Sequence, residues 1–422
     1  DPVQESYILA IVKEGLSVDE AVAGDEVEIL TEATPFYVES GGEVSDTGSL
    51  SGHDGESAGR VTDVRKHKLV PGLIYHVVTV DKGSFKLNDM VRLAVDNGRR
   101  HDIRRNHTAT HILHEELRRR LGKHVTQQGS LVAPERLRFD FSHGEAVGKE
   151  TLGQIEKAIN EAILANRPVS AELMPKDDAI ASGAMALFGE KYGDIVRTIA
   201  IGDRSEPYSL ELCGGLHVGE TGEIGLFRFT GEGAVAAGIR RIEAVTGTSA
   251  YQYVAERLDT LERLASQLNA PTHELEARVT ALQQDNRQLQ KQLESVQKEA
   301  LLGDFEALLA QTETVGDIAL LTALIPDAEP DSLRELIDRF RDKVPNGVAV
   351  LATVNGDRPV FVAGVSEALV KKGVHAGNIV REVAKVVGGG GGGRPNLAQA
   401  GGRDASKVGE ALAIVRELLA DS

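Results

Sequence analysis

Two pairs of potential metal ligands stand out in the sequence because the members of each pair lie four residues apart. The first pair is His107 and His111, and the second is Cys213 and His217. Side chains four apart on a helix project from one face, with Cβ atoms about 5–6 Å apart. A thiolate with three imidazoles is a ligand set that suits zinc. Because Cys213 is the only cysteine in 422 residues, we expect one shared zinc site rather than a helical histidine pair and an unrelated buried thiol.

The role of such a zinc ion is left open by the motifs. Four protein ligands normally close a structural site, whereas a hydrolytic site keeps one position for water. Polar side chains beside the motifs favour catalysis: Thr110 lies between the two histidines, and Gln127 and Ser130 follow in the next segment. With one ligand displaced, zinc could lower the pKa of a water and polarise an ester carbonyl. Otherwise it would orient a substrate's amino group or terminal ribose.

The composition is that of a soluble protein with two or three domains. The chain is 41% hydrophobic and 26% charged, has no tryptophan, and contains no apolar run long enough to span a membrane. A single cysteine excludes an intrachain disulfide and fits a reducing cytosol, so we expect a cytoplasmic protein. The first residue is Asp1, with neither a methionine nor a signal-like segment, which favours a fragment of a longer chain.

Charge is distributed unevenly along the chain. The net charge of −17 argues against indiscriminate nucleic-acid binding, and we expect no DNA partner. Residues 99–120 nevertheless hold seven arginines against three acidic residues, and residues 371–407 hold seven cations against two. Basic islands on an acidic body suit docking on phosphates in one orientation. Each island taken singly is equally consistent with a solvated helix face.

The patterns predict a multidomain α+β protein. Residues 1–95 read as a β-rich, barrel-like part, because short alternating runs are separated by glycine and aspartate turns. Residues 96–250 read as an α+β unit that carries the zinc motifs. In this unit we expect a helix from about His107 to Leu121 capped by Asn106, one strand over Leu131–Phe141, and an amphipathic helix over Thr151–Arg167.

Residues 251–315 are predicted to be helical. Apolar residues follow heptad spacing on both sides of a break at Asn269-Ala270-Pro271-Thr272, where Pro271 cannot continue a helix and Thr272 is a good N-cap. The break predicts two helices folded back on each other, and the alternative is a segmented coiled coil between subunits. Asn286, in an otherwise apolar seam, could fix the register.

Residues 316–422 are predicted to form a second α/β module. Strands over Val348–Thr353 and Val360–Val365 and a helix over Leu333–Phe340 precede six glycines, Gly388 to Gly393, and then Arg394. Such a run is either a flexible linker or a loop whose amides wrap an anion. The basic flank favours the anion-facing loop. A final helix reaches to about Leu419.

These motifs resemble those of one known family. His-x-x-x-His followed by Cys-Gly-Gly-x-His and by Gly238–Ala244 is similar to the editing domain of alanyl-tRNA synthetases. The segments Thr34–Gly42 and Arg136–Phe141 fit the same family, and the glycine-run module resembles its C-terminal (DHHA1-like) domain, which is shared with DHH-type phosphoesterases and contacts tRNA. The resemblance covers nearly all of the chain. No segment corresponds to the aminoacylation core, so the chain resembles the C-terminal half.

The resemblance implies roles for individual residues. It makes His107, His111, Cys213 and His217 the zinc ligands, with Thr110, Gln127 and Ser130 as candidates for catalysis. The residues that it implies in substrate binding, at the misacylated 3′ end or along the tRNA, are Thr34, Gly41, Gly42, Arg104, Arg105, Arg240, Gly392, Gly393 and Arg394. This chain departs from the family at two positions: Leu216 replaces the usual threonine, and Glu43 replaces the usual glutamine and adds a negative charge to a region expected to face RNA.

The activity implied is hydrolysis of serine or glycine from tRNA specific for alanine. A pocket built for alanine cannot exclude glycine and rejects serine poorly, because one small group gives only about 10–200-fold discrimination. Two alternatives remain: a tRNA-binding and dimerisation module with a purely structural zinc, or a free-standing trans-editing factor. The helical segment is compatible with a homodimer. A phosphoesterase is disfavoured, because residues 316–422 lack the aspartate and histidine cluster that this chemistry needs.

Overall fold

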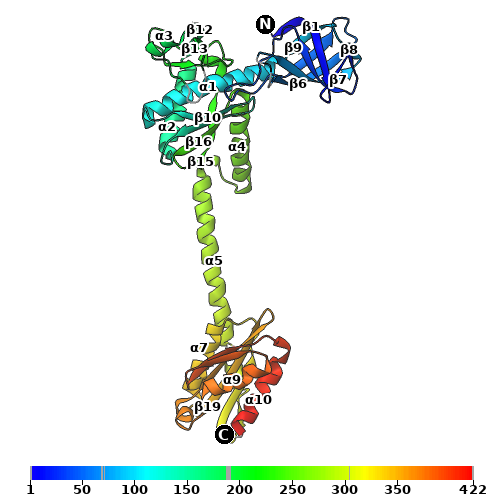
Figure 1. Ribbon diagram of the computed structural model, residues 1–422. Coiled ribbons are helices and arrows are strands. Elements are labelled where there is room, and N and C mark those ends of the chain that lie inside the picture. The colour runs from blue at the N-terminus through cyan, green and yellow to red at the C-terminus, as the bar shows by residue number, and fades with distance from the viewer. Residues whose placement is uncertain (1, 68–69, 71, 187–191, 304, 421–422) are drawn as a thin grey trace. The chain divides into compact units, whose positions relative to one another are not determined.

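The computed structural model describes residues 2–67, 70, 72–186, 192–303 and 305–420, with the backbone alone for 297–303 and 355. The chain divides into two compact units, Asp1–Leu264 and Ala265–Ser422 (Figure 1). Among the described residues, every helix is either too short or too polar to cross a membrane. The division into ranges ending at 95, 250 and 315 stays a prediction.

Six antiparallel strands at the start of the chain close into a barrel, because β9 pairs with β1 (Figure 1). Around the barrel the strands are β1 (Val3–Lys13), β4 (Glu26–Thr31), β7 (Ile74–Lys82), β6 (Ala58–Lys66), β5 (Gly48–Gly52) and β9 (Met90–Val95). Alternate residues face the core; β4 buries Val27, Ile29 and Thr31. The barrel-like fold predicted for this part is confirmed.

Three short strands decorate the barrel. β2 (Leu16–Val18) pairs with β1, and β3 (Glu20–Val22) forms a two-stranded ribbon with β8 (Ser84–Lys86). Phe85 on β8 is fully buried in the barrel core.

A long helix, α1 (Asn97–Leu121), follows the barrel directly. Asp96 caps it by accepting a hydrogen bond from the Arg99 N–H at 3.0 Å. The prediction that Asn106 caps a helix beginning at His107 is therefore wrong. Asn106 is instead buried in mid-helix, where its amide donates to the Ala133 carbonyl and accepts from the Thr246 hydroxyl.

Two antiparallel sheets flank α1 in the rest of this unit. One has the order β10-β11-β16-β15 and the other β12-β13-β14. The strands are β10 (Gln127–Val132), β11 (Leu137–Ser142), β12 (Val169–Pro175), β13 (Ile195–Ile201), β14 (Ser209–Leu212), β15 (Phe227–Ala236) and β16 (Ile239–Thr246). The further helices are α2 (Lys149–Leu164), α3 (Lys176–Ala181) and the 3₁₀ turn η1 (Thr221–Ile224). One hydrophobic cluster joins α1, α2 and the four-stranded sheet.

The single strand predicted over Leu131–Phe141 is wrong, since this segment contains the turn between β10 and β11. The turn is closed by a hydrogen bond from the Ala133 N–H to the Arg136 carbonyl at 3.0 Å. Pro134 lies in the turn and has no N–H to give to a ladder, which explains why the strand is interrupted there.

A buried ion pair joins the barrel to α1. The Arg100 guanidinium bonds both carboxylate oxygens of Asp46, with Nε 3.1 and 3.2 Å away, and donates to the Pro35 carbonyl at 2.6 Å. The side chains of Arg100 and Asp46 are 7% and 1% exposed. Asp46 also accepts from the Tyr37 N–H at 2.6 Å. The loop after β4, which contains Gly41 and Gly42, is thereby fixed against the helix.

The predicted helical break is confirmed. α4 (Gly247–Gln267) ends before Pro271, and α5 (Leu275–Gly303) begins after the 3₁₀ turn η2 (Thr272–Glu274). Residues of the apolar seam such as Leu258, Leu289 and Leu293 are 53, 63 and 59% exposed. Packing of these helices, on each other or on a second copy, stays a prediction.

The C-terminal module has one mixed sheet between two helical layers. Its order is β17-β18-β19-β20-β22-β21, and only the β18–β19 pair is parallel. The strands are β17 (Glu313–Val315), β18 (Ile318–Leu324), β19 (Gly347–Asn355), β20 (Arg358–Val365), β21 (Gly390–Gly393) and β22 (Leu397–Gly401). Residues of β19 alternate between two buried clusters, Val348 and Val350 in one and Ala349 and Leu351 in the other.

Helices cover both faces of this sheet. α9 (Ala376–Val386) and α10 (Val408–Ala420) pack on one cluster, and α6 (Phe305–Leu309) and α7 (Pro330–Lys343) pack on the other. α8 (Glu367–Lys371) and the 3₁₀ turn η3 (Ala405–Lys407) connect elements. The predicted α/β module and its final helix are confirmed, and α10 packs in the hydrophobic core.

Four of the six consecutive glycines form a strand rather than a linker or a loop. Gly390–Gly393 is the edge strand β21, hydrogen-bonded to β22. A Cβ at Gly391 or Gly393 would overlap Ala400 or Ala398 on β22. Close packing on β22 explains Gly391 and Gly393. The prediction of a loop is wrong over Gly390–Gly393, and the prediction that this segment faces an anion stays a prediction.

Removing one partner of the Arg100–Asp46 pair should destabilise the first unit. Arg100→Met leaves a buried carboxylate without its cation, for which we expect a loss of about 3–5 kcal/mol. Arg60→Met, which breaks the exposed pair with Asp81, should cost less than about 1 kcal/mol. Urea unfolding followed by circular dichroism measures both variants. Equal stability of the two would contradict a joint held by this ion pair.

Candidate metal centre and its cavity

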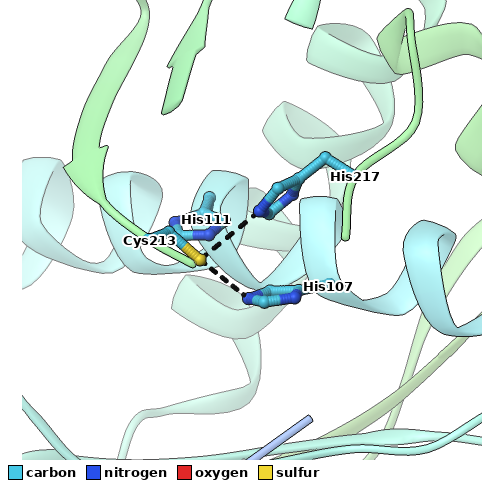
Figure 2. A group of neighbouring side chains, drawn as sticks. All are labelled: His107, His111, Cys213 and His217. Atoms are coloured by element: carbon cyan, nitrogen blue, oxygen red, sulfur yellow. Dashed lines mark hydrogen bonds between the residues drawn. The ribbon is translucent and has the colours of Figure 1, made fainter. Parts of the chain in front are cut away.

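The four residues of the two spaced pairs meet at one point. His107 and His111 project from one face of α1, and Cys213 and His217 follow β14 (Figure 2). The side-chain ligand atoms of all four lie within 4.8 Å of one another. The Cys213 Sγ is 3.3 Å from the His107 Nε2 and 3.4 Å from the His217 Nε2. The group could hold a metal ion.

Each of the three imidazoles is held at its Nδ1 atom, away from the cluster. The His107 Nδ1 lies 2.5 Å from the Glu43 carboxylate, and the His111 Nδ1 lies 2.6 Å from the Glu211 carboxylate. The His217 Nδ1 lies 3.1 Å from the Thr108 hydroxyl, which donates its own proton to the Arg104 carbonyl.

These contacts select one tautomer for every ring. Because the Nδ1 atoms donate to oxygen, the Nε2 lone pairs are available to a metal. The His111 Nε2 is buried and, among the described residues, has no hydrogen-bond partner. A buried, unpartnered ring nitrogen beside three other potential ligands is the observation expected of a metal site.

His114 and Glu211 are site residues that sequence reasoning missed. Glu211 is 2% exposed and bridges His111 and His114, whose Nδ1 lies 3.0 Å from the carboxylate. Burial raises the pKa of Glu211, but the charges of the two histidines outweigh it and lower this pKa. His114 is one turn beyond His111, and Glu211 stands two residues before Cys213. Both signals are in the sequence but are common in buried elements.

Two histidines of the cluster favour their protonated form when no metal is bound. Burial lowers the pKa of His107, but the Cys213 thiolate and the Glu43 carboxylate outweigh burial and raise it to about 9. Burial also opposes protonation of His111, but Glu211 and Cys213 raise its pKa to about 10.

The other two members favour their deprotonated forms. Burial raises the pKa of the Cys213 thiol, but the charges of His107 and His217 and the hydrogen bonds of the cluster hold it well below its ordinary value. The Gly215 N–H also donates to this sulfur at 3.4 Å. Burial, with the charge of His107, lowers the pKa of His217 to about 3. Without a metal, these shifts favour the thiolate form of Cys213 and the neutral form of His217.

A cavity of about 90 Å³ opens onto the cluster. Three of the potential ligands line it, together with the three residues expected in catalysis, Thr110, Gln127 and Ser130. Its full lining is Tyr37, Ser40, Gly41, His107, Thr110, His111, His114, Gln127, Ser130, Phe139, Glu211, Leu212, Cys213, Gly214 and Gly215. Gly42 lies just behind it, so close to Ser130 that a Cβ would overlap the Ser130 carbonyl.

Several residues expected to bind substrate have partners elsewhere. The Thr34 hydroxyl contacts the buried His76 at 2.7 Å and accepts from the Phe36 N–H. Arg240 pairs with Glu232 on the neighbouring strand. Their substrate roles stay predictions.

The arginines of α1 are also engaged by the protein. Arg105 bonds Asp102 at 2.8 Å and the Glu223 carbonyl at 2.8 Å, whereas the Nε of Arg104 is buried without a partner among the described residues. Part of this basic island, above all Arg100, serves the fold. Gly392, Gly393 and Arg394 belong to the second unit and are exposed; their role in binding is untested.

Glu43 and Leu216, the two residues that differ from the family motif, are in contact at the cluster. Glu43 is completely buried against His107 rather than facing solvent. The Leu216 N–H donates to the same carboxylate at 2.9 Å. This contact uses the backbone of Leu216, so it does not require a hydroxyl at that position.

Three family models match successive parts of the chain. "tRNA synthetases class II (A)" matches residues 3–99, "Threonyl and Alanyl tRNA synthetase second additional domain" matches 196–243, and "DHHA1 domain" matches 317–421. The alanine–tRNA ligase of Geobacillus thermodenitrificans is 46% identical over 97% of this chain and 46% of its own length. That of Roseiflexus sp. is also 46% identical, over 98% of this chain and 47% of its own length.

The chain belongs to the alanyl-tRNA synthetase family. It corresponds to the C-terminal part of the family's members and spans about half the length of the relatives that it matches. The crystal structure of the C-Ala domain from Aquifex aeolicus alanyl-tRNA synthetase is 41% identical, covering 26% of this chain and 98% of that chain with a TM-score of 0.25. The match at 196–243 contains Cys213 and His217.

Gly215 should be needed for metal binding, whereas its neighbour should not. A Cβ at Gly215 would overlap the His107 ring and the Glu43 carboxylate, but one at Gly214 has nothing within 4 Å. We expect Gly215→Ala to weaken zinc binding by about 10–100-fold and Gly214→Ala to leave it unchanged. Competition with a chromophoric chelator measures both. Wild-type affinity in Gly215→Ala would contradict the close contact.

Metal affinity should fall as the pH falls. Because the raised pKa values of His107 and His111 place protons on both rings at neutral pH, and a ligating imidazole must be neutral, metal uptake releases protons. Below pH 9, each lost pH unit favours the protonated, metal-free form, by up to about 100-fold for two protons. Zinc titrations at pH 6.5, 7.5 and 8.5 measure this slope. An affinity independent of pH would refute the protonation scheme.

Proposed function

We propose that the first unit hydrolyses the ester of misacylated tRNA for alanine, removing serine or glycine, at a zinc centre held by His107, His111, Cys213 and His217. The observation that carries the proposal is that the ligand cluster opens onto a cavity with polar walls. A purely structural zinc needs no such opening.

The donor set fits zinc. Tetrahedral zinc with bonds of about 2.0–2.1 Å to nitrogen and 2.3 Å to sulfur separates its ligand atoms by roughly 3.3–3.6 Å. The two sulfur–nitrogen distances, 3.3 and 3.4 Å, lie close to that range. Zinc bound here would polarise an ester carbonyl or a water.

Polar side chains that line the cavity would discriminate between the seryl and the alanyl ester. The Thr110 hydroxyl donates to the Asn106 carbonyl at 2.8 Å, which leaves the oxygen free to accept from a substrate hydroxyl or amino group. Ser130 and Gln127 offer further donors and acceptors on β10. A small polar pocket favours the seryl hydroxyl over the alanyl methyl, because an unpaired buried polar group is costly.

The whole chain should remove serine from seryl-tRNA for alanine and spare the alanyl ester. Cys213→Ala removes a ligand, so we expect deacylation to fall by more than about 100-fold with an unchanged circular dichroism spectrum. Arg60→Met, which changes an exposed residue of the barrel, is the control. A zinc-loaded, folded wild-type chain that binds tRNA without hydrolysing either ester would support a structural zinc instead.

We further propose that the C-terminal module binds the body of the tRNA. It exposes a set of cations in its basic island: Lys371, Lys372, Arg381, Arg394 and Arg403. Replacing Arg394 and Arg403 by glutamate should weaken tRNA binding and flatten its salt dependence, with no change in zinc content. The control is the double variant Lys385→Glu and Glu382→Lys, which reverses an exposed ion pair and keeps the net charge of the wild type. Unchanged affinity of the arginine variant would exclude this surface.

A further inference from the structure

The loop after β4 that contains Gly41 and Gly42 is called the barrel loop here. Among the described residues, Glu43 is the charged side chain of this loop that contacts a potential metal ligand. Its carboxylate is 0% exposed. One oxygen, Oε2, lies 2.5 Å from the His107 Nδ1 and accepts from the Leu216 N–H at 2.9 Å. Glu43 therefore touches both segments that supply ligands, the helix and the loop after β14.

The backbone holds Glu43 in place independently of its side chain. The Val132 N–H donates to the Gly42 carbonyl at 2.7 Å, and the Val44 N–H donates to the Val132 carbonyl at 3.1 Å. Gly42 and Ser130 are in close backbone contact. The loop is thus attached to β10, and the loss of the Glu43 carboxylate should not displace it.

The second carboxylate oxygen of Glu43, Oε1, is buried and is left without a hydrogen-bond partner in the described part of the chain. A buried carboxylate with one unpaired oxygen is costly unless positive charge lies nearby. The other oxygen, Oε2, contacts the Nδ1 of His107, and the Nε2 of the same ring faces the ligand cluster.

We propose that Glu43 is a positioning residue of the metal centre, a role that rests on the zinc site of the proposed function. By accepting a hydrogen bond from the His107 Nδ1, the carboxylate orients the ring so that its Nε2 can act as a ligand. By accepting a hydrogen bond from the Leu216 N–H, it holds the loop that carries Cys213 and His217 close to His107. The barrel thereby takes part in building the centre, although none of the four ligands lies in it.

The test compares Glu43→Ala and Glu43→Gln with Glu39→Ala, which alters an exposed glutamate of the same loop. Zinc affinity is measured by chelator competition, the ligand field by the absorption of the Co²⁺-substituted chain, and the hydrogen bond of the His107 Nδ1 proton by ¹⁵N NMR. We expect Glu43→Ala to weaken zinc binding by about 10–100-fold, to shift the cobalt bands and to lose this hydrogen bond. Glu43→Gln, whose amide oxygen can accept both hydrogen bonds, should recover most of the affinity, and Glu39→Ala should match wild type.

The readouts separate this proposal from the deacylase proposal. Wild-type zinc affinity and cobalt bands in folded Glu43→Ala would overturn the positioning role, whatever the deacylation result. A chain that hydrolyses no ester but shows the expected loss in Glu43→Ala would refute the activity and support the positioning role. If Glu43→Ala does not fold, Glu43→Asp, which withdraws the carboxylate by one methylene, carries the test, and wild-type zinc binding by it would overturn the role.

Discussion

The first unit depends on one constraint: buried imidazoles must present their Nε2 atoms to a common point. A ring achieves this only when its Nδ1 proton has a fixed acceptor. Glu43, Glu211 and Thr108 are those acceptors for His107, His111 and His217. They come from the barrel loop, from β14 and from α1, so the centre joins elements that have separate hydrophobic cores.

The same constraint explains features that would otherwise be unfavourable. The carboxylates of Glu43 and Glu211 are almost completely buried, which is costly for unpaired charges. Here each contacts a histidine, and positive charge on the cluster offsets the desolvation. The Asp46–Arg100 pair fixes the barrel loop against α1 nearby. The ion pair of Arg100 and the contact of His107 with Glu43 both join the barrel loop to the first turns of α1.

Membership of the alanyl-tRNA synthetase family fits the division into two units. The models for the class II synthetase part and the second additional domain match segments of the first unit, and the DHHA1 model matches the second. The glycine-rich strand of the second unit shows that a low-complexity run can be ordered. Gly391 and Gly393 leave space that Ala400 and Ala398 occupy, so strand packing accounts for these two glycines.

The sequence by itself identified the four side chains that the fold brings together, because residue type and a spacing of four are local properties. It also predicted the barrel-like part, the helical break and the α/β module, since alternation and Pro271 act locally. It misplaced the start of α1 and missed the β10–β11 turn.

Only the tertiary structure decided which groups hold the imidazoles, and it gave Glu43 a place beside His107. The physical reason is distance along the chain. The Nδ1 partners lie 64, 100 and 109 residues from their histidines, and no local pattern encodes a hydrogen bond that forms only when separate elements pack together.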